Sequence, residues 1–151
     1  MKRLRGYCMV SESTLRRIER FEEGMKLLDK VAKTRFEKYS KSLDLQSIAE
    51  RNLQVCTEVI IDLSNVIISK KGLKVPSTYK ESIEILKENK VLKDKLAKDV
   101  EEIVGIRNII VHMYADIKAE ILHKNLSKFI KVLRETLKKL LEFCKKNKID
   151  P

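Results

Sequence analysis

Arg107, His112 and Tyr114 are the side chains best placed to do chemistry, because they interrupt an otherwise apolar run. His112 is one of only two histidines in the sequence. A guanidinium group stays charged and offers a planar fork of donors that fits a phosphate. An imidazole group can take up and release a proton near neutral pH. This combination fits cleavage of RNA without a metal ion, with the 2′-hydroxyl group of the RNA as nucleophile.

In this hypothesis, His112 moves the proton of the 2′-hydroxyl or of the leaving oxygen, and Arg107 stabilises the charge of the transition state. Asn108 orients the imidazole or binds a phosphate oxygen. Each residue also has a purely structural interpretation. His112 would then be a surface residue and Tyr114 a residue at the edge of the core. Arg107 would pair with a carboxylate of its own helix or of an interface.

A single helix does not by itself bring Arg107 and His112 together. Residues five positions apart lie about 140° apart around an ideal helix. Arg107 could reach around the helix, or the β-branched run at 109–111 could bend it. Alternatively, two copies of the helix meet across a two-fold axis, so that two guanidinium and two imidazole groups share one cleft. We favour the homodimer, because it builds one compact site from groups that a single helix separates.

The elements that carry these residues are predicted to be helices. Pro and Gly are scarce, and apolar residues recur at spacings of three and four. This periodicity predicts long helices at about 15–39, 45–67, 93–114 and 126–144, a shorter helix at 78–86 and a helical turn at 118–122. We therefore expect an all-α bundle of four or five long helices. Residues 1–10 are expected to be a basic lead-in, and residues 11–151 a single domain.

Local signals predict several helix ends. The candidate N-caps are Ser11 or Ser13 for the first helix, Asp44 for the second, and Thr78, with Glu81 in a capping box, for the third. Gly72 can terminate the second helix. Gly105 costs roughly 1 kcal/mol of helix stability relative to Ala, so we expect another backbone to approach closely there. His123 has no companion motif, and we expect it at the surface.

The formal net charge of +11 at pH 7 is high for 151 residues. Such a surface attracts RNA, an anionic membrane or an acidic protein, but it also serves solubility alone. The three cysteines lack close spacing, which argues against a disulfide framework and a zinc site. We expect no metal and no cofactor. No signal-peptide pattern and no apolar run of bilayer length is present, so we expect a soluble cytoplasmic protein without membrane contact.

The pattern Arg107-x4-His112-x-Tyr114 resembles the motif of the HepT-like toxins, which belong to the HEPN superfamily of small helical ribonucleases. Three further segments resemble the same family. They are ERNLQV at 50–55, PSTYKES at 76–82 and VGIRN at 104–108. The resemblance extends from about Leu15 to Leu141, which is nearly the whole chain.

This resemblance implies an antiparallel, HEPN-like bundle that forms a two-fold homodimer, with the motifs of both chains lining a cleft. It implies an endoribonuclease toxin of a type II, or modification-type, toxin–antitoxin pair, with Arg107 and His112 as its catalytic residues. It also implies a partner, an MntA-like minimal nucleotidyltransferase antitoxin, that AMPylates Tyr114. The added bulk and negative charge would block the cleft. The alternative is a non-catalytic helical subunit that binds nucleotide or RNA in a nucleotidyltransferase complex.

Overall fold

The structure, a computed structural model, describes residues 10–112 and 118–151. These residues form helices and no strand, which confirms the predicted all-α class. The helices are α1 (Glu12–Ala32), α2 (Phe36–Ser40), α3 (Leu43–Lys70), α4 (Tyr79–Glu88), α5 (Asp94–His112) and α6 (Ala119–Lys146).

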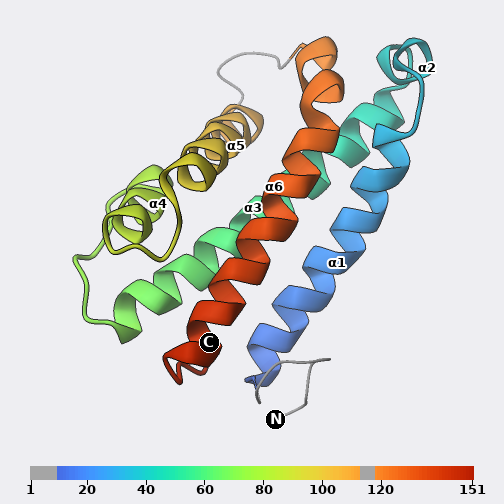
Figure 1. The fold of residues 1–151 in the computed structure, drawn as a ribbon. Helices are drawn as coiled ribbons and strands as arrows, with labels where there is room; N and C mark the ends of the chain where they lie inside the picture. The colour runs from blue at the N-terminus through green and yellow to red at the C-terminus, as the bar shows by residue number, and fades with distance from the viewer. Residues whose placement is uncertain (1–9, 113–117) are drawn as a thin grey trace.

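Helix α3 is central, since it contacts every other helix. Figure 1 shows α1 and α5 running in one direction along the bundle, and α3 and α6 in the other. Helices α4 and α5 pack against each other and against α3, and α5 also contacts α6. The bundle is therefore antiparallel.

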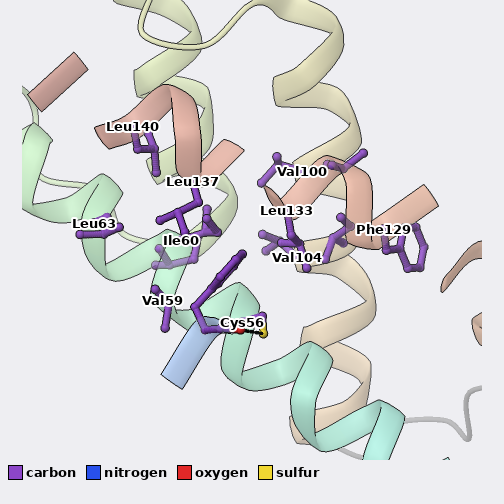
Figure 2. Packing of buried hydrophobic residues seen from close by; sticks show 14 of the residues in the cluster. Cys56, Val59, Ile60, Leu63, Val100, Val104, Phe129, Leu133, Leu137 and Leu140 are labelled. Atoms are coloured by element: carbon purple, nitrogen blue, oxygen red, sulfur yellow. Dashed lines mark hydrogen bonds between the residues drawn. The ribbon is translucent and has the colours of Figure 1, made fainter. Parts of the chain in front are cut away.

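Apolar side chains of α3, α5 and α6 meet in the middle of the bundle (Figure 2). Ile60 and Leu63 of α3, Val100 and Val104 of α5, and Leu133 of α6 have at most 5% of their surface exposed. Burial of such a side chain contributes about 1.5–3 kcal/mol. This core fixes α5 against α3, and so it fixes the side chains that follow Val104 on α5.

Helices α1 and α3 approach closely at Gly24. A Cβ atom added to Gly24 would lie 2.6 Å from the sulfur of Cys56, so only glycine fits there without a shift. The Cys56 thiol is fully buried, and its Sγ donates a weak hydrogen bond to the Phe21 carbonyl oxygen at 3.6 Å. Burial, with Glu22 nearby, raises the pKa of the Cys56 thiol to about 12. Cys56 therefore packs as a small hydrophobic residue, as its apolar neighbours in the sequence indicate.

Most of the predicted helix ends are confirmed. The Thr14 amide donates to the Ser11 hydroxyl at 3.3 Å, and the Glu81 amide donates to the Thr78 hydroxyl at 3.0 Å. Gly72 ends α3 with a φ angle of 63°. The second-helix prediction was wrong by two residues: Ser42, not Asp44, caps α3, because its hydroxyl accepts the Leu45 amide at 3.2 Å.

Two predicted boundaries were also wrong. The helix predicted at 15–39 ends at Ala32, and the chain turns before it resumes as α2. The turn is stabilised by the Thr34 hydroxyl, which donates to the Lys30 carbonyl oxygen at 3.1 Å, and it carries Tyr39 into full burial. The turn predicted at 118–122 is not separate, because α6 begins at Ala119 and runs on without a break.

Candidate functional site

Among the described residues, Arg107 is the one charged side chain that the fold buries, with only 9% of its surface exposed. Its Nη2 and Nε atoms both donate to one carboxylate oxygen of Glu58 on α3, at 2.7 and 3.2 Å. Its Nη1 atom donates to the Oδ1 atom of Asn108 at 3.2 Å. Three hydrogen bonds from two helices therefore hold the guanidinium group in one orientation.

Tyr79, the first residue of α4, covers the guanidinium group. The Arg107 Cζ atom lies 4.6 Å from the centre of the Tyr79 ring, which is a cation–π distance. Tyr79 itself has 36% of its surface exposed. The arginine thus lies where α3, α4 and α5 meet, behind a ring that faces solvent.

Glu58 is held in turn by its own helix. The Gln54 amide donates to the same Glu58 oxygen at 3.1 Å, and Arg51 donates to the Gln54 oxygen at 3.4 Å. Partial burial alone would raise the pKa of Glu58, but the hydrogen bonds from Arg107 and Gln54 outweigh it and lower the pKa. Glu58 is therefore an anion at neutral pH and a fixed partner for the arginine.

Arg107 does pair with a carboxylate, but that carboxylate belongs to a different helix of the same chain. Sequence reasoning missed Glu58, Gln54 and Tyr79 in these roles. A signal was present, because polar residues recur at 51, 54 and 58 on a helix that is otherwise largely apolar. The three segments that resemble HepT-like toxins also converge here, since each one supplies residues to the cluster around Arg107.

His112 has a different environment. It is exposed and forms the last residue of α5, whereas Arg107 is buried more than one turn earlier. One chain therefore presents these two groups in separate surroundings, as the predicted separation of about 140° requires. Asn108 is half-buried and bonds to Arg107. Tyr114 lies outside the described residues.

Within the described chain no backbone approaches Gly105 closely, contrary to the prediction for a single chain. The nearest atoms to a Cβ added there are Nζ and Cε of Lys80, at 3.7 and 3.8 Å. The Lys80 side chain therefore lies across α5 at the turn that carries Arg107. This places a second cation against α5, two residues before Arg107 in the sequence.

His123 is not a simple surface residue, which corrects a second prediction. It is half-buried, and its Nε2 atom lies 2.7 Å from the Thr34 carbonyl oxygen. Its ring centre lies 4.9 Å from that of Tyr39 and 5.6 Å from that of Phe36. The histidine joins α6 to α2, and its tertiary contacts explain it without a catalytic role.

Within residues 10–112 and 118–151, no group of three or more His, Cys, Asp or Glu side chains is arranged to hold a metal ion. In the same part of the chain, every helix is too short or too polar to span a lipid bilayer.

Residues 12–140 match the model of the family described as ribonuclease HepT-like. An mRNA nuclease HepT from Shewanella oneidensis is 31% identical over 83 residues, which are 55% of this chain and 62% of the relative. The chain thus spans less than two thirds of that relative. A tRNA nuclease HepT from Aphanizomenon flos-aquae is 33% identical over 110 residues, which are 72% of each protein.

Solved structures share the fold. The tri-AMPylated HEPN toxin of Shewanella oneidensis, solved in complex with an MNT antitoxin, superposes with a TM-score of 0.79 at 22% identity, over 87% of this chain and 98% of the toxin. YutE of Bacillus subtilis, a cytosolic protein of unknown function, superposes with a TM-score of 0.77 at 19% identity, over 96% of both chains. The predicted HEPN-like bundle is therefore confirmed.

Proposed function

Because the chain belongs to the ribonuclease HepT-like family, we propose that it is a metal-independent endoribonuclease toxin that cuts RNA with Arg107 and His112. One observation carries the proposal: an arginine buried to 9% exposure and fixed by three hydrogen bonds lies five residues before an exposed histidine on one helix. We place the enzyme in the cytoplasm, where cellular RNA is found.

The fixed guanidinium group suits a charged transition state. Arginine has five N–H donors. Three of them donate to Glu58 and Asn108, which leaves two for the oxygens of a phosphate group. Since the group is already oriented, binding a phosphate costs little further ordering. Asn108 supports catalysis here by holding Arg107.

His112 moves the proton. Its imidazole takes the proton of the 2′-hydroxyl group as that oxygen attacks the neighbouring phosphorus, or it gives a proton to the leaving oxygen. The bond between phosphorus and the leaving oxygen breaks as the new bond forms. Because the nucleophile is a 2′-hydroxyl group, DNA is not a substrate.

A homodimer would complete the site. Ile106, Ile109 and Ile110 are half-buried and Val111 is 36% exposed, so α5 keeps apolar surface uncovered between Arg107 and His112. A second copy of α5 placed across a two-fold axis would cover this surface. It would also bring two guanidinium and two imidazole groups to one cleft. Val111→Asp is expected to yield monomers in multi-angle light scattering.

We further propose that an MntA-like minimal nucleotidyltransferase is the antitoxin and AMPylates Tyr114. The AMPylated Shewanella oneidensis toxin, solved in complex with an MNT antitoxin, supports this assignment. Attached AMP adds negative charge two residues after His112, where it competes with RNA phosphate for the cations of the cleft. Mass spectrometry of the co-expressed pair should find added AMP on Tyr114, and unmodified Tyr114 would reject the modification.

Purified protein tests the ribonuclease proposal directly. It should cut single-stranded RNA in the presence of EDTA, and His112→Ala should abolish cutting while the circular dichroism spectrum stays helical. Arg16→Ala is the matched control for Arg107→Ala, because Arg16 is 75% exposed and pairs with Glu12 on α1. Cutting that survives both His112→Ala and Arg107→Ala rejects the proposal.

A second function is favoured by the burial of Arg107. If the Arg107–Glu58 pair only holds α5 to α3, the chain is a non-catalytic subunit that binds RNA or nucleotide for a nucleotidyltransferase. A stoichiometric complex without cleavage of any RNA would support this alternative.

A further inference from the structure

The segment from Lys33 to Leu43, which we call the α2 tip, carries exposed cations. Lys33, Arg35, Lys38 and Lys41 are all exposed, and Glu37 is the one acid among residues 33–41. In the described part of the chain, none of these four cations forms an ion pair. Arg134, in contrast, pairs with both Glu22 and Asp29. The charge of the α2 tip is therefore free to bind an anionic partner.

An aromatic ring is exposed in the middle of this charge. Phe36 has 41% of its surface exposed, whereas Tyr39, three positions later, is fully buried and anchors the tip. The Phe36 ring contacts the ring of His123, and the His123 ring is held by its contact with the Thr34 carbonyl oxygen. The exposed ring is thus held in place from behind, which makes it a platform rather than a mobile side chain.

The α2 tip lies at the same end of the bundle as the proposed cleavage site. Figure 1 shows α2, the end of α5 and the start of α6 together at that end. His112 closes α5 there, and the exposed Lys118 and Lys124 lie at the start of α6, the helix that contacts α2. A strand of RNA that reaches His112 can therefore continue over a surface of cations and an aromatic ring.

We propose that the α2 tip binds a single-stranded segment of RNA outside the cleavage site, with one base stacked on Phe36 and phosphates on the surrounding cations. Bases stack on aromatic side chains only where they are unpaired, whereas lysines bind any phosphate backbone. The combination selects RNA with an accessible single strand. The proposal rests on the proposed ribonuclease function, since it names the form of the RNA substrate.

RNA binding tests the α2 tip. A fluorescent single-stranded RNA 20-mer is titrated with the full chain in EDTA, and binding is followed by anisotropy. The chain carries His112→Ala so that it does not cut the RNA. Phe36→Ala should weaken binding by about tenfold, and Phe36→Tyr should restore it, because tyrosine also stacks. Val75→Ala is the control, since Val75 is 83% exposed but aliphatic and lies outside the tip. Binding to an RNA duplex should not respond to Phe36→Ala.

A second variant tests the charge. Replacing Lys33, Arg35, Lys38 and Lys41 by Gln should lower the salt slope of binding by up to about 3, as expected for lost single-strand phosphate contacts. Replacing Lys70, Lys71, Lys146 and Lys148 by Gln removes the same charge at the opposite end of the bundle and should lower it less.

Unchanged single-strand affinity in Phe36→Ala, or equal losses for duplex and single strand, would overturn the α2-tip proposal. Equal effects of the two fourfold Gln variants on the salt slope would do so as well. If Phe36→Ala bound RNA normally but no longer formed a complex with the nucleotidyltransferase, the tip would bind the protein partner, and the RNA-binding proposal would be rejected. Each of these results leaves the ribonuclease proposal standing if the wild-type protein cuts RNA in EDTA.

Discussion

Two arginines of this protein each join two helices through carboxylates, yet their surroundings differ. Arg107 is buried, and it bonds to Glu58 on α3 under the ring of Tyr79. The Arg134 side chain is 39% exposed, and it bonds to Glu22 and Asp29 on α1 across open surface. A surface pair contributes little, whereas a buried one is costly to build unless its geometry is exact. The contrast indicates that the surroundings of Arg107 hold it in one orientation, whereas Arg134 only links α6 to α1.

The largest expected difference concerns activity. Arg107→Ala should lower the single-turnover rate of RNA cleavage by about 10²- to 10³-fold, as loss of one preorganised donor group does. Arg134→Ala removes the same group and should leave the rate within about twofold, because a surface pair stabilises the fold only slightly. Quenched-flow cleavage of one RNA by both variants checks this, and similar losses in both would erase the contrast.

The two carboxylate partners should differ in stability. Glu58→Ala leaves Arg107 buried without its counter-charge, and we expect a loss of about 2 kcal/mol in the free energy of unfolding. Asp29→Ala should cost less than about 1 kcal/mol. Urea denaturation followed by circular dichroism measures both. Equal losses would mean that the Arg107 pair is an ordinary surface pair.

Two glycines extend the comparison between a tightly packed position and an open one. Gly24→Ala should cost about 1–3 kcal/mol, because its Cβ atom would overlap the buried Cys56 sulfur between α1 and α3. Gly105→Ala should gain about 0.5–1 kcal/mol, since alanine favours helix and meets only the flexible end of Lys80. Thermal melts of both variants give the signs, and destabilisation by Gly105→Ala would indicate a contact that one chain does not supply, such as a second protomer.

The smallest expected effect is on pH dependence. Since the pKa of Glu58 is lowered in the folded state from its ordinary value of 4.5, Glu58 adds stability that is present above pH 4.5 and is lost as the pH falls through its folded pKa. The Glu58→Gln variant lacks this contribution, so its stability should fall less between pH 5 and pH 3. Parallel acid-unfolding curves for the two proteins would show that the carboxylate is not preferentially stabilised by Arg107.

Sequence reasoning found the features that local chemistry determines. The cap at Thr78 and the glycine at the end of α3 depend on neighbouring residues, and they were predicted correctly. Ser11, one of two candidates for the first cap, also bonds to Asp150 and Pro151, which the sequence did not reveal. The break after Ala32 was missed, because Phe36 and Tyr39 keep the apolar spacing of the preceding helix across the turn. Periodicity along the chain cannot distinguish a continuous helix from two helices that bury the same positions.

The candidate site was predicted in part for the same reason. Arg107, Asn108 and His112 lie close together in the sequence, so their types and spacing were visible. Glu58 is 49 positions from Arg107, and Thr34 is 89 positions from His123. Such contacts depend on how helices pack, which one sequence does not reveal. The polar residues of α3 became interpretable only once α5 was placed beside them.

Mixed dimers test the central claim, that Arg107 and His112 of two protomers together form the ribonuclease site. Arg107→Ala and His112→Ala chains with different tags are co-expressed, the mixed dimer pool is purified, and RNA cleavage is measured in EDTA. If each site takes its arginine from one protomer and its histidine from the other, a mixed dimer has one intact site of two. The purified mixed dimers should then recover about half of wild-type activity, although each variant alone is inactive. A mixture no more active than the separate variants, or variants that are active alone, would contradict the account.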